Sequence, residues 1–266
     1  MINWALFRRE MKISVKFLII FGAIITMYVS CIIGLYDPET VKMLDGFTKA
    51  MPEVMAAVGM TPGATNLLGF MISYLYGFIL LIFPMVFSIL RGNGLIAKYI
   101  DTDSMVYLMA APVKRRTIAS TQMLVLLSGI SLLLIYTTIL EVVVAQALFP
   151  GELVLSELLV LNAGLLLLHI SIGAICFCSS CIFSETKYSA LLGAGIPTVM
   201  YVFKMIASIG DGAKNVKYLS IFTLFDPNGL VANDSSSLLN LVFLLLIALV
   251  LYPLGTAIFC RKDLHV

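Results

Sequence analysis

Residues 158–184 read LLVLNAGLLLLHISIGAICFCSSCIFS, a run of 27 residues without Asp, Glu, Lys or Arg. A helix needs about 20 predominantly apolar residues to cross the ~30 Å hydrocarbon core of a bilayer. This run is long enough to do so. It therefore predicts a membrane-spanning helix, and it decides the class of the protein.

Five more apolar runs lie on either side of this one. The predicted spans cover about 17–36, 67–90, 118–147, 156–184, 188–209 and 236–260. Of all residues 61% are hydrophobic and 12% are charged, whereas soluble domains carry about a quarter charged residues. The connections are too short for a soluble domain. We therefore predict an all-α integral membrane protein with six transmembrane helices that form one domain over residues 1–266.

The positions of Lys and Arg predict how the chain is oriented. With six spans, both ends of the chain share a side with the loops around residues 91–117 and 185–187. That side carries twelve Lys and Arg residues, and the other side carries five. Because cytoplasmic loops are enriched in these residues, both termini are expected in the cytoplasm. The net charge of +2 reflects this topology and gives no reason to expect a nucleic-acid partner.

Residues 1–16 show the pattern of a helix that lies in the membrane interface. Apolar residues, Trp4 among them, recur at helical spacing, and a basic stripe runs beside them. The stripe consists of Arg8, Lys12 and Lys16. A Trp at headgroup depth with cations toward anionic lipid is typical of interfacial helices. The alternative is that these cations only anchor the first span.

Two segments on the outer side are expected to form short helices that do not span the membrane. Residues 37–66 predict one or two amphipathic helices, broken near Pro52, and residues 210–234 predict a helical excursion that turns back. Proline removes a helix hydrogen bond and bends the helix. Kinks are therefore expected within three spans, at Pro84, Pro197 and Pro253.

Three ionisable residues interrupt the predicted spans: Glu141, His169 and Lys204. A charge at the bilayer centre costs at least about 2.5 kcal/mol, so each of these residues needs a partner, water or a function. Glu141 and Lys204 both fall in the outer halves of their helices, so we expect an ion pair between them or an outward-opening path that they line. For His169 a hydrogen bond to a neighbouring helix is favoured over a proton relay.

The cysteines predict neither a disulfide framework nor a metal site. The sequence holds five, an odd number, and Cys176, Cys178 and Cys181 lie within an apolar run. On a helix Cys176 and Cys178 point about 200° apart, and no histidine or fourth cysteine is close in the sequence. Buried small hydrophobic side chains are the favoured interpretation, and no cofactor is expected in this chain.

The loop between the second and third spans is the most informative connection. Residues 101–116 read DTDSMVYLMAAPVKRR, which predicts about two turns of helix that end before Ala111, because Pro112 disfavours the α region there. A short, Met-rich apolar helix on the cytoplasmic side is typical of a segment that fills a groove on another protein. The alternative is an interfacial loop that ends in a cluster of stop-transfer charges.

This stretch resembles the segment between the second and third spans of type-2 ATP-binding-cassette exporter permeases. The similarity extends to the basic N-terminal helix, the six spans, the external Met51-Pro52-Glu53, the turn at Leu219–Pro227 and the closing Phe259-x-Arg-Lys-Asp-Leu. It thus covers essentially the whole chain. In that family the short cytoplasmic helix is a coupling helix that docks on a separate ATPase.

The resemblance implies a permease subunit that moves a lipophilic or amphipathic substrate out of the cell, in the plasma membrane of a bacterium. Two permeases, identical or related, would pair, and each would bind a cytoplasmic ATPase that holds ATP and Mg²⁺. This chain has no Gly-x-x-x-x-Gly-Lys-[Ser/Thr] motif of its own. The docking residues implied by the resemblance are Asp103, Met105, Tyr107, Leu108 and Met109, with Arg115 and Arg116 at the edge.

The main alternative function is a secondary transporter that uses Glu141 and His169. Such a protein would be energised without an ATPase and would not need the Met-rich cytoplasmic helix. An intramembrane enzyme is a third possibility, but it would need clustered acids or histidines at the membrane face, and the whole sequence contains two histidines.

Overall fold

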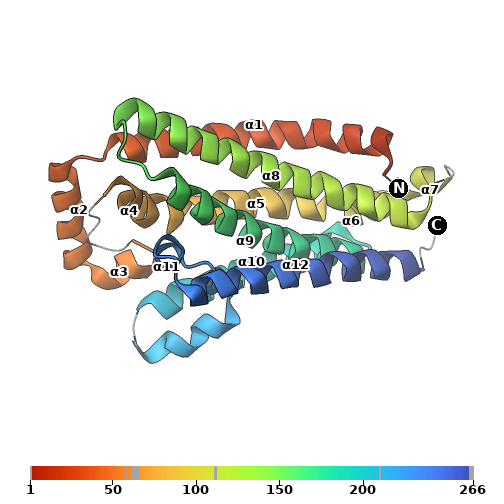
Figure 1. Ribbon diagram of the computed structural model, residues 1–266. Helices are drawn as coiled ribbons and strands as arrows, with labels where there is room; N and C mark the ends of the chain where they lie inside the picture. The colour runs from red at the N-terminus through yellow and green to blue at the C-terminus, as the bar shows by residue number, and fades with distance from the viewer. Residues whose placement is uncertain (1, 58, 61–65, 111–112, 210, 264–266) are drawn as a thin grey trace.

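The computed structural model describes residues 2–57, 59–60, 66–110, 113–209 and 211–263, and in these segments the chain forms helices and connections without a β-strand (Figure 1). Six helical segments in these ranges are long and apolar enough to cross a membrane. This confirms the prediction of an all-α, multi-pass membrane protein.

Four of the six spans begin and end close to the predicted bounds. They are α8 (Arg115–Leu148), α9 (Leu155–Ile182), α10 (Thr186–Ile209) and α12 (Ser235–Arg261). The apolar runs set the extent of these helices, because a run without charge can stay in hydrocarbon while its backbone hydrogen bonds close within the helix. Apolar runs therefore locate these spans to within a few residues.

The first span continues directly from the N-terminal segment. Helix α1 runs without interruption from Trp4 to Gly34, and the Asn3 side chain accepts a hydrogen bond from the backbone N–H of Leu6 at its start. No proline separates residues 1–16 from residues 17–36. The predicted interfacial helix is thus the first part of a 31-residue helix, not an element with a direction of its own.

The second span is broken, and the break is not at the proline. Helix α4 (Leu67–Met71) passes into the π-helical turn η1 (Ile72–Tyr76), and α5 (Ile79–Asn93) starts after Gly77 and Phe78. Pro84 lies within α5, which continues past it. The break lies at Gly77 and Phe78, directly after a wider π turn that already alters the hydrogen-bond ladder. The kink at Pro84 stays a prediction.

Short helices connect the spans, as predicted for both outer segments. Helix α2 (Pro38–Ala50) ends at Met51 and α3 (Pro52–Ala57) begins at Pro52, because proline suits the first helical position but has no N–H for a preceding turn. The second segment forms η2 (Asp211–Leu219), η3 (Ile221–Leu224) and α11 (Pro227–Val231).

Helix α9 is the centre of the bundle. It contacts α5, α8, α10, α11 and α12. Small residues permit the closest approaches: a Cβ added to Gly92 of α5 would lie 2.5 Å from Cβ of Cys176 on α9. Both chain ends and α7 (Met105–Ala110) lie at the same end of the elongated bundle, whereas α2 and α3 lie at the other (Figure 1).

Candidate functional site

The segment predicted to dock on a partner lies at the end of the bundle that carries both termini (Figure 1). After α5 the chain turns into α6 (Ala97–Asp101), then α7, and then enters α8. The predicted two turns of helix are present as the six residues of α7. The predicted helix end at Ala111 and Pro112 lies outside the described residues.

The predicted docking side chains do not all face outward. Tyr107 is 82% exposed and its neighbour Val106 is 40% exposed. Met105 is buried, so its assignment to the docking surface is wrong: it packs into the core of this chain. Leu108 and Met109 are half-buried against that core. With only six residues, α7 must use part of its apolar surface to stay attached to the bundle.

Asp103 and the two arginines differ in their surroundings. Asp103 is exposed and has a positive φ of 53°, a conformation that Asp adopts more readily than most residues. Arg116 is exposed. Arg115 donates a hydrogen bond from Nη1 to the carbonyl oxygen of Lys262 at 2.7 Å. Arg115 therefore joins the start of α8 to the C-terminal segment.

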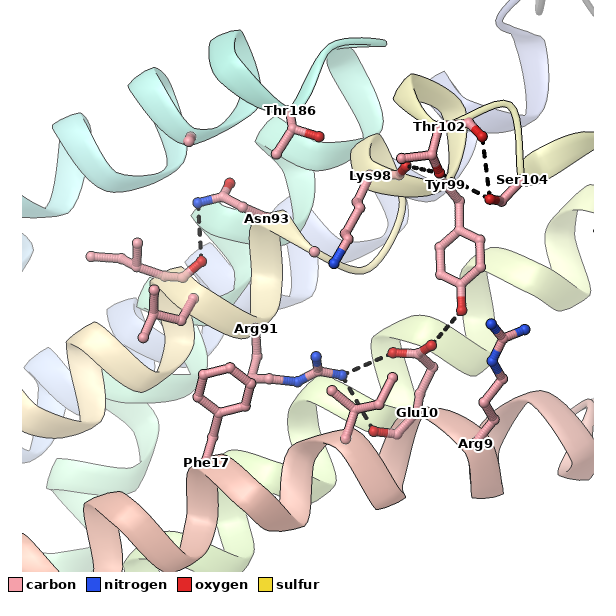
Figure 2. Close-up of a pocket in the computed structure, with 15 residues that line it drawn as sticks. Arg9, Glu10, Phe17, Arg91, Asn93, Lys98, Tyr99, Thr102, Ser104 and Thr186 are labelled. Atoms are coloured by element: carbon pink, nitrogen blue, oxygen red, sulfur yellow. Dashed lines mark hydrogen bonds and ion pairs between the residues drawn. The ribbon is translucent and has the colours of Figure 1, made fainter.

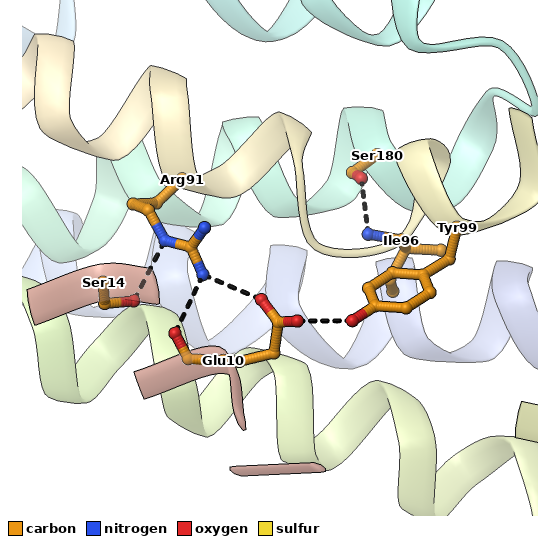
Figure 3. Close-up of polar contacts among 6 residues, drawn as sticks. All are labelled: Glu10, Ser14, Arg91, Ile96, Tyr99 and Ser180. Atoms are coloured by element: carbon orange, nitrogen blue, oxygen red, sulfur yellow. Dashed lines mark hydrogen bonds and ion pairs between the residues drawn. The ribbon is translucent and has the colours of Figure 1, made fainter. Parts of the chain in front are cut away.

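A buried ion pair lies beneath this end of the bundle, and sequence reasoning did not find it. Arg91 of α5 donates from Nη2 to Oε2 of Glu10 on α1 at 2.9 Å and from Nε to Oγ of Ser14 at 2.9 Å (Figure 3). The side chains are 6% and 2% exposed. It is the one ion pair within the described part of the chain.

The second oxygen of Glu10 connects this pair to α6. The hydroxyl of Tyr99 donates to Oε1 of Glu10 (Figure 3). Both carboxylate oxygens thus have a donor, one from α5 and one from α6. A buried charge is stable only when it is paired and its remaining lone pairs are satisfied, so the geometry of the carboxylate fixes α1, α5 and α6 relative to one another.

A serine from the central helix holds the start of α6. Oγ of Ser180 accepts hydrogen bonds from the backbone N–H groups of Ile96 at 3.2 Å and Ala97 at 2.9 Å (Figure 3). The first N–H groups of a helix have no partner within the helix, and here a side chain of α9 supplies one. The turn from α5 to α6 is therefore attached to α9 as well as to α1.

Glu10 could have been singled out from the sequence by its surroundings. It is the one acidic residue among the first 36, and it stands beside Arg8, Arg9 and Lys12. Glu10 and Ser14 are four residues apart and so share a helix face. The four residues predicted for an interfacial helix, Trp4, Arg8, Lys12 and Lys16, are all exposed on α1, away from this buried face.

A pocket of about 560 Å³ opens beside the ion pair (Figure 2). Residues of α1, α5, α6 and α10 line it, together with the turn between α5 and α6. Its polar lining includes Arg9, Glu10, Lys98, Thr102 and Thr186. Its size falls in the ordinary range of pockets that hold small molecules.

The expected ion pair between Glu141 and Lys204 is not formed. Oε2 of Glu141 accepts from the hydroxyl of Tyr76 at 3.0 Å and from Nδ2 of Asn162 at 2.7 Å. Lys204 donates from Nζ to the carbonyl oxygen of Gly77 at 3.2 Å. Glu141 and Lys204 thus each bond to a residue at the break in the second span, Tyr76 and Gly77 respectively. The apolar run of residues 67–90 gave no sign of this break.

His169 has the neighbouring-helix hydrogen bond that the sequence favoured. Its Nε2 lies 2.8 Å from the carbonyl oxygen of Leu80 on α5, and the side chain is fully buried. The thiol of Cys176 donates to the carbonyl oxygen of Gly193 on α10. Across the described residues, no group of three or more His, Cys, Asp or Glu side chains is placed to hold a metal ion.

Comparison with known proteins does not assign the chain to a family. No protein-family model matches it, and no curated protein matches it. Function is therefore inferred from the residues of this chain and their arrangement.

Proposed function

We propose that this chain is the permease subunit of an ATP-driven exporter and that α7 docks on a separate cytoplasmic ATPase. The substrate would be lipophilic or amphipathic and would move out of the cell. Two permeases, identical or related, would work together in a plasma membrane. On this proposal the end of the bundle with both termini faces the cytoplasm, in accord with the excess of Lys and Arg there.

The observation that carries the proposal is the exposure of Tyr107 on a short helix that the buried side chain of Met105 attaches to the bundle. A connection between two spans does not require an aromatic side chain that is 82% exposed. Aromatic side chains in such positions often anchor protein–protein contacts. The resemblance of residues 101–116 to the coupling segment of exporter permeases supports the same interpretation.

The contacts around α6 provide a route by which docking can act on the spans. A displacement of α7 moves α6, since the two are separated by three residues. Tyr99 then pulls on Glu10 of α1, and Ser180 couples the same turn to α9. Closure of two ATPase subunits would therefore tilt α1, α5 and α9 together, because the buried polar contacts resist separation.

Co-purification with the candidate ATPase tests the proposal. We would express the chain with an ATPase encoded beside it and compare wild type with Tyr107→Asp. Tyr218→Asp is a matched control, because Tyr218 is 78% exposed in the short helix η2, toward the other end of the bundle (Figure 1). We expect Tyr107→Asp to lose the ATPase and Tyr218→Asp to retain it.

The other outcomes separate the docking site from the function. If both variants retain the ATPase, the subunits associate but α7 is not the docking site. If wild type never binds an ATPase, the exporter proposal is wrong and a secondary transporter becomes the leading interpretation. Size-exclusion profiles of both variants show whether loss of binding follows from misfolding.

A further inference from the structure

The pocket beside Glu10 has a basic end and an apolar end. Arg9 and Lys98 are cations of its lining, and Phe17 lies further along α1 than Arg9 (Figure 2). Ile13, between Arg9 and Phe17 in the sequence, also lines the pocket. From Arg9 to Phe17 the helix rises eight residues, or about 12 Å at 1.5 Å per residue. This polarity runs along the first span, in the direction from the membrane surface to the hydrocarbon.

Two cations at the basic end are not neutralised within the chain. Glu10 also lines the pocket, but its two oxygens are engaged by Arg91 and Tyr99. Neither Arg9 nor Lys98 forms an ion pair with any residue that the structure describes. Arg9 lies over the ring of Tyr99 at 5.9 Å. The pocket thus carries a net charge of about two positive units, with low-dielectric walls that strengthen its attraction for an anion.

A buried hydroxyl in the lining has no partner. Oγ1 of Thr186 is inaccessible to solvent and makes no hydrogen bond within the described chain, and Thr186 lines the pocket. Buried polar groups are normally satisfied, so an unpaired one calls for an explanation. Because this atom has no surface accessible to solvent, a ligand in the pocket does not reach it, and the hydroxyl is not part of the proposed site.

The apolar end is open along the surface of α5. Leu90 is 48% exposed and Ile13 is 38% exposed, although both lie on helices long enough to span a membrane. Ala190 of α10, a small residue, also lines the pocket. A hydrocarbon chain can lie against these side chains, whereas a free phosphate ion would leave them without a partner.

We propose that this pocket binds one anionic phospholipid, with the phosphate held by Arg9 and Lys98 and the acyl chain against Phe17 and Leu90. The same phosphate chemistry occurs in soluble anions, but the apolar wall favours the lipid. A bound lipid would brace α1, α6 and α10 where the ion pair already joins α1 to α6. Lipid binding requires only that the chain lies in a membrane, so it stands or falls independently of ATPase docking.

Native mass spectrometry of the purified chain tests the proposal. The protein would be equilibrated with phosphatidylglycerol or phosphatidylcholine, and the bound fraction would be measured for wild type and Arg9→Gln/Lys98→Gln. Arg8→Gln/Lys12→Gln is the matched control, because it removes two exposed cations from the same helix outside the pocket. We expect wild type to retain one phosphatidylglycerol in preference to phosphatidylcholine. The pocket variant should lose roughly 30-fold in affinity, the value of two basic-residue contacts with anionic lipid.

A second pair of variants distinguishes a lipid from a soluble anion without changing charge. Ala190→Phe fills the apolar end, and Leu191→Phe adds a ring at a neighbouring position that is 67% exposed. We expect Ala190→Phe to release phosphatidylglycerol and Leu191→Phe to retain it. If Arg9→Gln/Lys98→Gln and Arg8→Gln/Lys12→Gln lose the same affinity for phosphatidylglycerol, binding depends on general surface charge and the proposal is overturned. Displacement of the lipid by millimolar inorganic phosphate or glycerol phosphate would also overturn it, in favour of a soluble anion.

Discussion

Replacing Glu10 by Gln would leave the guanidinium of Arg91 buried without its carboxylate. Removing one partner of a buried pair typically costs 3–5 kcal/mol, because the remaining charge is not compensated. We therefore expect Glu10→Gln to lower the free energy of unfolding by about 3 kcal/mol, measured by denaturation in detergent micelles. Glu185→Gln is the control: Glu185 is exposed and forms no ion pair within the described residues, and a change below about 0.5 kcal/mol is expected.

The double variant Glu10→Gln/Arg91→Gln should recover part of this loss. Residues in one hydrogen-bond network show interaction energies of about 0.5–3 kcal/mol in double-mutant cycles. If the two single changes simply add, the pair does not stabilise the junction of α1 and α5, and the described coupling of these helices is wrong.

The residues of this junction show what a sequence can and cannot reveal at the scale of side chains. The exposed basic stripe followed from spacing on one helix. The pairing of Glu10 with Arg91 joins positions 81 residues apart in sequence, and only the packing of α1 on α5 brings them together. Met105 was misassigned for the same reason: its apolar character fits a docking surface or a core equally well, and tertiary contacts decide between them.

At the scale of elements, Lys204 of α10 supplies a donor at the break in the second span. The carbonyl oxygen of Gly77, at the start of the break, accepts a hydrogen bond from Nζ of Lys204. A buried acceptor left without its donor costs about 1–3 kcal/mol. We expect Lys204→Met to lower the free energy of unfolding by that amount in the same detergent assay, whereas Lys204→Arg keeps a donor and should recover most of it.

Lys187→Met is the matched control for this change. Lys187 is an exposed lysine on the same helix, so its loss should leave stability nearly unchanged. A Lys204→Met protein as stable as wild type would contradict a structural role for the contact with Gly77. Rescue of an unstable Glu141→Leu protein by Lys204→Met would instead be evidence for an ion pair between Glu141 and Lys204 in the wild type, which the structure does not contain.

The bounds of a helix were predictable wherever one feature of the sequence determines them. Absence of charge located the long spans, and Pro52 located the division between α2 and α3. The break at Gly77 and Phe78 was missed because Pro84 is the stronger local signal. A proline within a buried helix is tolerated when neighbouring groups satisfy the freed carbonyl. Pro84 has no N–H for the carbonyl oxygen of Leu80, and here Nε2 of His169 on α9 lies 2.8 Å from that oxygen.

At the scale of the whole molecule, the arrangement places Tyr107 and Tyr218 toward opposite ends of the bundle (Figure 1). Both are largely exposed, so each reports on the compartment at its end. Six spans with twelve basic residues on one side and five on the other predict that Tyr107 is cytoplasmic and Tyr218 external. This topology is a condition for α7 to meet a cytoplasmic ATPase.

Labelling with a membrane-impermeant maleimide tests this orientation. In intact cells Tyr218→Cys should react and Tyr107→Cys should not, and permeabilisation should expose Tyr107→Cys to the reagent. The wild-type chain measures the background from its natural cysteines, of which Cys31 is exposed and Cys176, Cys178 and Cys181 are buried. The reverse pattern would place α7 outside the cell, where no ATP-driven partner can dock. Labelling of both variants from one side would contradict the six-span topology, because three spans, α8, α9 and α10, separate α7 from η2 and an odd number of crossings puts them on opposite sides.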